Sequence, residues 1–446
     1  MILSMKWLLF LLLLLPAIVE GQIITTVAGN GTSINSGDGG PASASAVDYP
    51  CGGVFDKFGN YYFATGDDGN SVRKISKSGT ITTVAGTIGV SGYSGDGGQA
   101  TNAKMSSTQA VAVDTFGNIY IVDATNNRIR KVDIATGVIS TIAGNGIGGY
   151  NGDDIQATNA SLNGPNDICL DLLGNIYIAD YTNNRVRKIN TSGTIFTVAG
   201  NGTAGFPTDD EIATSAAISP WGICSDVAGN LYIADGYARV YKLNLSGHLI
   251  FYAGNGANGS NGDGGYATLA ETTPFYIKMD KFGNLIIAEF QNAKIRMVNS
   301  LGYIYTIAGN GVRGYLGDGG PATAGEINSP GGLAIDSCNN IFIADSHDWR
   351  IRELQYAHCN YLQTSETVGK SEISIYPNPA KDLININNFE FPSKYLIVNL
   401  FGSIMAKGEL KEKNSSISLQ NLAQGIYMLV LCDSIGNRIV RKLIIQ

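Results

Sequence analysis

A short apolar strand followed by a glycine turn recurs six times in this chain of 446 residues. It reads TIAGNG at residues 141–146, and its alanine stands in the six copies at Ala28, Ala85, Ala143, Ala199, Ala253 and Ala308. Successive copies are therefore separated by 57, 58, 56, 54 and 55 residues. A nearly constant period of this length indicates one supersecondary unit repeated along the chain, as in solenoids and propellers.

Each period holds four short β-rich runs in the same order. Between residues 108 and 144 they read QAVAVD, IYIVD, RIRKVD and VISTIAG, and the turn-forming segments TFGN, ATNN and ATG separate them. Apart from one turn near ATNA, no segment has the length and the apolar spacing of a helix. Four antiparallel strands per period are typical of a propeller blade, and the 57 glycines agree with many tight turns.

The order of the runs predicts how the repeats close. The first copy of the fourth strand precedes any complete repeat, and no copy follows Leu354. We therefore expect residues 23–28 to pair with the third strand of the last repeat, because that pairing leaves no open sheet edge. The predicted fold is all-β: a six-bladed β-propeller of four-stranded antiparallel blades over residues 22–354, closed by its N-terminal strand.

The first 21 residues differ from the repeats in composition. A lysine, an apolar run from Trp7 to Leu15 and small residues after it predict a secretory signal peptide over residues 1–21, cleaved before Gln22. A retained membrane anchor is the alternative, but the run is shorter than the ~20 residues of a membrane span. We expect a secreted mature protein without a membrane span.

The repeats resemble a known family. GN followed by YIAD, N(R)IRK and T(V/I)AGNG occur in order in the repeats, with GDGGPAT between some of them, and this pattern resembles the NHL repeat. The resemblance covers roughly residues 22–354. It implies a six-bladed propeller that usually works as a binding platform for protein or RNA and occasionally as an enzyme. The formal net charge of −7 argues against a nucleic-acid partner, because phosphate contacts need a basic surface.

A polar linker over residues 355–370 leads to a different segment at residues 371–446. YPNPAKDLININN, YLIVNLFGSIM, QGIYMLVL and the terminal RKLIIQ resemble the C-terminal sorting domain of the type IX secretion system of Bacteroidota. The matching positions include Pro377, Asn378, Pro379, Gly425, Tyr427 and Lys442. The resemblance implies type IX machinery as a partner and a place outside the cell or on its surface. Alternating apolar strands and polar turns predict a small β-sandwich, and an ordinary binding module is the alternative.

The chain has six cysteines. Cys169 and Cys224 occupy a core position of an innermost strand, so we expect buried free thiols. Cys338 lies in the first turn of the last repeat, and Cys359 lies five residues past its third strand. These two points share one end of a four-stranded meander, which predicts a disulfide between Cys338 and Cys359.

Acids end the second strands of the repeats, and bases begin the third strands. In one repeat both residues change together to glutamate and lysine, and in another both charges are lost, at Thr65 and Ser71. This joint variation predicts structural ion pairs across the hairpin rather than a catalytic site. The expected pairs are Asp123 with Arg128, Asp180 with Arg185, Asp235 with Arg239, Glu289 with Lys294, and Asp345 with Arg350.

The loops between repeats carry a recurring acid. The aligned positions are Asp38, Asp96, Asp153, Asp209, Asp263 and Asp318. Three residues earlier, four of the six loops have an aromatic residue: Tyr93, Tyr150, Phe206 and Tyr315. In one interpretation each aspartate caps its own turn and each ring packs on a neighbouring blade. In the other, the loops form a rim that binds a carbohydrate, a peptide or a divalent cation such as Ca²⁺.

The sequence predicts a binding or adhesion module for a carbohydrate or protein ligand, without a cofactor. The three histidines, His248, His347 and His358, lie in separate parts of the repeats and cannot converge on one metal. Ser346, His347 and Asp348 are contiguous, whereas a catalytic triad draws its members from separate elements. The alternative is a hydrolase or lyase in the central funnel, which needs two carboxylates ~5–10 Å apart.

Overall fold

The computed structural model describes residues 22–355 and, towards the C-terminus, residues 374–387, 393–399, 404–410, 412, 415–420, 422, 424–433 and 438–445. The predicted signal peptide, residues 356–370 of the predicted linker and Cys359 lie outside these residues, whereas Gln355 is described as the end of a strand. Contacts divide the chain into two compact units, with the boundary between Gln355 and Tyr356. Helices of the described residues are single 3-10 turns, and none is long and apolar enough to cross a membrane.

The described residues of the first unit form six antiparallel sheets of four main strands. The first three contain β2 (Pro50–Phe55), β3 (Tyr61–Thr65), β4 (Ser71–Ile75) and β5 (Ile81–Ala85); β6 (Thr108–Val113), β7 (Ile119–Asp123), β8 (Arg128–Val132) and β9 (Ile139–Ala143); and β11 (Pro165–Leu170), β12 (Ile176–Asp180), β13 (Arg185–Ile189) and β14 (Thr194–Ala199). The two-residue strand β10 (Ile155–Gln156) extends the third sheet beside β14.

The remaining three sheets repeat this order. They contain β16 (Pro220–Ser225), β17 (Leu231–Asp235), β18 (Arg239–Leu243) and β19 (His248–Ala253), with the short β15 (Glu211–Ile212) at the edge; β20 (Tyr276–Met279), β21 (Leu285–Glu289), β22 (Lys294–Val298) and β23 (Ile304–Ala308); and β24 (Pro330–Ile335), β25 (Ile341–Asp345), β26 (Arg350–Gln355) and β1 (Ile23–Ala28). The expected helical turn near ATNA is the 3-10 turn η3 (Ala157–Asn159).

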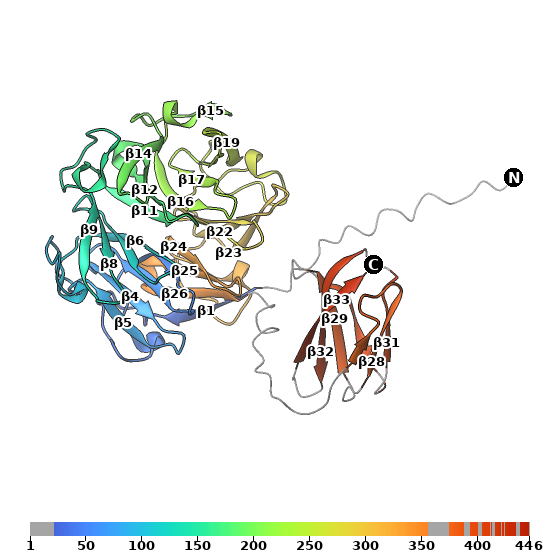
Figure 1. Cartoon of the computed structure of the whole chain (residues 1–446). Helices are drawn as coiled ribbons and strands as arrows, with labels where there is room; N and C mark the ends of the chain where they lie inside the picture. The colour runs from blue at the N-terminus through green and yellow to red at the C-terminus, as the bar shows by residue number, and fades with distance from the viewer. Residues whose placement is uncertain are drawn as a thin grey trace. The chain divides into compact units, whose positions relative to one another are not determined.

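The six sheets close into a ring. Their first strands contact one another in the order β2, β6, β11, β16, β20 and β24, and β24 contacts β2 again. Figure 1 shows these sheets side by side around a common centre. The last sheet contains both ends of the unit, because β1 pairs antiparallel with β26 and Ile24 lies opposite Leu354. The predicted pairing of the N-terminal strand is therefore confirmed.

The core of the ring lies between neighbouring sheets. The second strands β3, β7, β17 and β21 are buried at every residue. Sheets that are covered on both faces have strands with continuous apolar runs, which explains why IYIVD and LYIAD do not alternate with polar residues. Cys169 and Cys224 are buried free thiols between such sheets, as predicted. Cys338 is half-buried, and its disulfide with Cys359 stays a prediction.

The second unit has its own hydrophobic core. One sheet contains β27 (Ser374–Tyr376), β28 (Leu383–Asn387) and β31 (Ser415–Ser418), and the other contains β30 (Ile404–Leu410), β29 (Ser393–Asn399), β32 (Gly425–Asp433) and β33 (Arg438–Ile445). Buried residues of both sheets, among them Ile384, Ile397 and Tyr427, form one cluster. Asn378 of the exposed YPNP segment accepts a hydrogen bond from the backbone N–H of Ile444 at 2.9 Å.

Candidate functional site

Buried arginines anchor the loops between the sheets. Five arginines on the third strands have completely buried side chains, and each forms an ion pair of 2.6–3.0 Å with an aspartate of the preceding loop. The pairs are Arg73 with Asp38, Arg130 with Asp96, Arg187 with Asp153, Arg296 with Asp263, and Arg352 with Asp318. The loop aspartates are 32–45% exposed, so their carboxylates neutralise charges that have no access to water.

Four of these five arginines also contact the acids that end the second strands, which corrects the predicted ion pairs. The distances are 3.3 Å for Arg130 and Asp123, 3.6 Å for Arg187 and Asp180, 3.4 Å for Arg296 and Glu289, and 3.2 Å for Arg352 and Asp345. The predicted partners Arg128, Arg185, Lys294 and Arg350 stand opposite these acids in the strand register but form no ion pair with them.

Arg128 shows why the predicted pairs do not form. Its guanidinium donates hydrogen bonds to the carbonyl oxygens of Asn126 and Asn145 instead of contacting Asp123. Arg130, two residues further along the same strand, points to the same face as Arg128 but is enclosed by the loop. At Thr65 and Ser71, where both charges are lost, the two hydroxyl oxygens lie 2.8 Å apart, so this direct contact exists.

The fourth sheet departs from the pattern. Tyr241 stands where the other sheets have the buried arginine, and Asp235 accepts hydrogen bonds from the backbone N–H groups of Ser219 and Tyr237. Burial raises the pKa of Asp235 to about 7, although these hydrogen bonds and Arg239 favour its charged form. The predicted ion pair between Asp235 and Arg239 is not formed, because Arg239 stacks on Phe251 with its guanidinium 4.4 Å from the ring centre.

The four loop aromatics brace the loops and remain accessible. Tyr93, Tyr150 and Tyr315 stack on Arg128, Arg185 and Arg350, with each guanidinium 3.7–4.0 Å from the ring centre. Phe206 packs against Tyr237 instead, with ring centres 4.6 Å apart. The four residues are 40–61% exposed. The structure therefore shows bracing contacts at this rim, while each ring keeps surface that a ligand could contact.

Six rings from five sheets form a continuous arc on the same face. Tyr49 precedes β2, His347 lies in the turn after β25, Phe290 follows β21, Phe275 precedes β20, Trp221 is in β16, and Tyr181 follows β12. Successive ring centres in this order are 5.3, 5.7, 5.0, 4.7 and 4.3 Å apart. His347 is exposed and the other five are half-buried. We call these six residues the aromatic arc; sequence analysis did not identify it.

A buried tyrosine fills the centre of the ring beneath the aromatic arc. Tyr276 donates hydrogen bonds to the carbonyl oxygens of Gln109 and Asn166, at 3.0 and 3.1 Å. Gly52 leaves room for it, because a Cβ at that position would lie 2.9 Å from the tyrosine ring. Asp167 is also buried in this layer, where burial raises its pKa and the N–H groups of Ile168 and Ile223 bind its carboxylate. A ligand on the aromatic arc would therefore rest on a closed floor.

Three acids stand at the Tyr49 end of the aromatic arc. Burial, together with the charges of Asp68 and Asp67, raises the pKa of Asp48 to about 6. Burial and Asp68 also raise the pKa of Asp67, whereas His347 lowers it. Asp67 and Asp68 are exposed, and Asp48 is half-buried. The face therefore combines aromatic surface with a local excess of negative charge.

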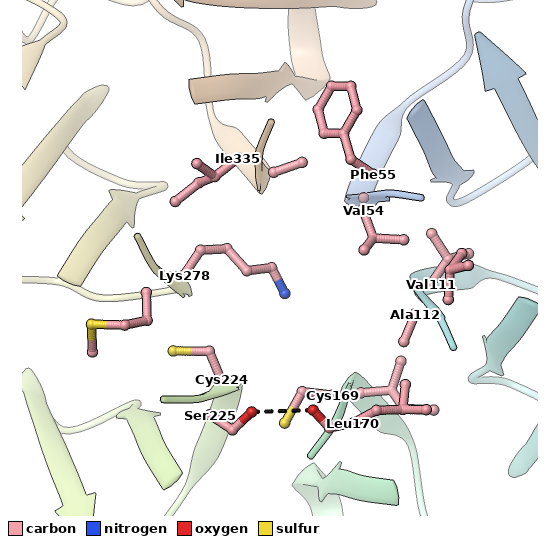
Figure 2. A pocket seen from close by; sticks show the side chains of 15 residues that line it. Val54, Phe55, Val111, Ala112, Cys169, Leu170, Cys224, Ser225, Lys278 and Ile335 are labelled. Atoms are coloured by element: carbon pink, nitrogen blue, oxygen red, sulfur yellow. Dashed lines mark hydrogen bonds between the residues drawn. The ribbon is translucent and has the colours of Figure 1, made fainter. Parts of the chain in front are cut away.

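The later residues of the first strands enclose a cavity of about 250 Å³ at the opposite end of the ring. Figure 2 shows the ammonium group of Lys278 directed into it, with Cys169 and Cys224 on one wall. No aspartate or glutamate is among its lining residues, so its walls do not supply the carboxylate pair that the hydrolase alternative needs. In the described part of the chain, no three His, Cys, Asp or Glu residues are grouped as a metal site.

Family models match three segments of the chain. Residues 374–446 match the secretion system C-terminal sorting domain, residues 162–189 match the NHL repeat, and residues 87–147 match the teneurin NHL domain. The matched segments are similar to NHL repeats and to a type IX sorting domain, and solved structures with propeller-like folds are similar to the first unit. The chain carries NHL repeats followed by a type IX sorting domain, which implies secretion to the cell surface or the extracellular space.

Similar proteins occur in a plant, a mammal and a bacterium. The Arabidopsis thaliana protein SUPPRESSOR OF QUENCHING 1, chloroplastic, is 26% identical over 63% of this chain, and Mus musculus teneurin-4 is 30% identical over 46% of it. The chain spans only 28% and 8% of the length of these relatives. A solved structure described as an auxiliary nutrient binding protein from Bacteroides ovatus has a TM-score of 0.54 and 17% identity, covering 75% of this chain and 76% of its own.

Proposed function

We propose that this protein is exported through the type IX system and acts outside the cell as a non-catalytic binding or adhesion module. In this proposal the six sheets of the first unit are the blades of a six-bladed propeller, which occupies residues 22–354. The second unit is a small β-sandwich that delivers the propeller, with residues 1–21 as its signal peptide. The ligand is a carbohydrate or a protein.

The aromatic arc carries this proposal. Half-buried rings on a closed floor offer apolar surface in fixed positions, and binding sites are usually lined by such rings with a few polar groups beside them. The rings come from five sheets, so no single repeat needs them for its own hairpin. A protein of the same fold is described as an auxiliary nutrient binding protein, which makes sugars and peptides the first ligands to examine.

We place the loop rim at the edge of the same binding surface. It comprises Tyr93, Tyr150, Phe206 and Tyr315, whose exposed ring surfaces would extend the contact beyond the aromatic arc. The loop aspartates of five sheets already pair with buried arginines, so Ca²⁺ bound there would have to share their carboxylates. The rim is therefore proposed to contact the ligand chiefly through its rings.

Glycan and peptide arrays with the purified protein test the proposal. We expect at least one class of ligand to bind, and the double variant Trp221→Ala/Phe275→Ala to lose that binding. The matched control is Phe116→Ala, because Phe116 is 80% exposed in the first turn of its sheet, at the opposite end of the ring. Arrays that bind the arc variant as well as the unchanged protein would contradict the assignment of the site.

A further inference from the structure

One ring of the aromatic arc stands in a conformation that bulky residues rarely adopt. Tyr49 has φ +34°, in the left-handed region. The corresponding positions before β6, β11 and β24 have the same sign of φ but carry small residues, Ser107, Gly164 and Ser329. The turn itself therefore does not require an aromatic side chain. Strain of this kind is typical of functional positions, and here it places a ring beside His347.

The acids next to Tyr49 differ from five of the six recurring loop acids, each of which pairs with a buried arginine. Asp38 and Asp96 are typical of the loop acids, since each is paired with a buried arginine. Among the described residues, no arginine or lysine forms an ion pair with Asp48, Asp67 or Asp68. Their principal electrostatic neighbours are one another and His347. Among the described residues, the negative charge at this end of the aromatic arc is thus paired with no arginine or lysine, and His347 is its one basic neighbour.

Rings and carboxylates together suit one kind of ligand group. The face of an aromatic ring attracts a cation through its quadrupole, and the attraction grows when water is excluded. A nearby carboxylate adds Coulomb attraction, which a neutral sugar would not use. We propose that the aromatic arc, with Asp48, Asp67 and Asp68, binds its ligand through a protonated amine or a quaternary ammonium group. This inference rests on the proposed binding function and specifies its ligand chemistry.

A pair of small probes separates charge from shape. Choline carries a quaternary ammonium, and 3,3-dimethylbutan-1-ol has the same shape without the charge. We expect choline to bind at least about tenfold more tightly in NMR titrations of the full chain, with chemical-shift changes in the Trp221 indole, because cation–π contacts and carboxylates act only on the charged probe. A lysine tetrapeptide and its fully acetylated form repeat the comparison for a ligand that is a protein.

Charge-neutral variants identify the acids. Asp67→Asn/Asp68→Asn should reduce the preference for choline by at least about threefold, because the rings still attract the cation but two carboxylates are lost. Asparagine tolerates the φ of +43° at position 67. The control Asp154→Asn/Asp210→Asn removes the same charge from exposed loop positions that also have positive φ, and it should keep the preference. Equal affinity for both probes, or an undiminished preference in the Asp67→Asn/Asp68→Asn variant, would overturn the inference. Arc-dependent binding of a neutral glycan in the arrays would then leave the proposed function standing.

Discussion

The guanidinium of Arg130 lies 2.6 Å from the carboxylate of Asp96, although 34 residues separate them in the sequence. The contact ties the loop before β6 to the third strand of the same sheet. Because Arg130 also binds the buried Asp123, one side chain holds two acids from different elements. Equivalent contacts between arginine and loop aspartate in four other sheets fix the loops of those sheets in the same way.

Replacing Arg130 by methionine should destabilise the protein strongly. The variant leaves Asp123 buried without its cation, and breaking a buried pair costs about 3–5 kcal/mol of unfolding free energy. Arg128→Met is the matched control: it removes an equal charge from the same strand, together with a stacking contact and two hydrogen bonds to carbonyl oxygens, for which we expect about 1–2 kcal/mol. Urea unfolding of the two variants measures the difference. Equal losses would show that Arg130 is not the stabilising partner.

Asp235 should give the fourth sheet a distinct pH dependence. Its pKa in the folded protein is about 7, above the ~3.9 of an unfolded chain, so the folded state binds the proton more tightly. Its contribution to stability is present at low pH and is lost as pH rises from 4 through 7. The destabilisation caused by Asp235→Asn should therefore shrink by about 2 kcal/mol between pH 5 and pH 8.

Asp226→Asn provides the comparison for this titration. Burial alone would raise the pKa of Asp226, but hydrogen bonds from Asn230 and neighbouring groups lower it. Asp226 is therefore charged in both states from pH 5 to pH 8, and the effect of its replacement should not change over that range. Thermal unfolding at the two pH values measures both variants. A constant effect for Asp235→Asn would contradict the raised pKa.

The last sheet should depend on the N-terminal strand. Deleting residues 22–29 would expose the edge of β26, so we expect aggregation or a large fall in melting temperature. Point variants give a finer test, because Ile24 is completely buried whereas its neighbour Ile23 is 43% exposed. Ile24→Asp should destabilise by more than about 3 kcal/mol, and Ile23→Asp by about 0.5 kcal/mol. A deletion variant that stays monomeric with an unchanged melting temperature would disprove this closure.

Local chemistry made the strands of the first unit predictable. Turn residues such as Gly117 and Asn118 separate runs of apolar residues. The same pattern recurs in every repeat, so each strand could be checked against its equivalents in the other repeats. The pairing of β1 with β26 followed from counting strands, because a ring has no other place for the unpaired copy. The ion pairs were harder to predict from the sequence. Asp123 stands opposite Arg128 in the strand register, but it forms its ion pair with the buried Arg130.

The aromatic arc could not be predicted from the repeat pattern of the sequence. Trp221 and Phe275 belong to different sheets, and their rings meet only because the ring of sheets brings the starts of β16 and β20 together. In the other repeats the position of Trp221 carries Cys51, Gln109, Asn166, Phe275 or Gly331, so only two of the six repeats have an aromatic residue there. The sequence shows only that single repeats depart from the common pattern at these positions. That the departing residues lie close together could be seen only in the three-dimensional structure.

The loop rim supports a final prediction. The quadruple variant with alanine at Tyr93, Tyr150, Phe206 and Tyr315 should fold, because these are loop positions and each lost stacking contact costs about 0.5–1 kcal/mol. We expect it to lose attachment to the ligand that the arrays identify, since the exposed ring surfaces extend the aromatic arc. A variant with phenylalanine at the three tyrosine positions keeps the rings but loses the hydroxyl bonds to Asp96 and Asp153, and it should retain binding. Full binding by the alanine variant would mean that these rings only brace the loops.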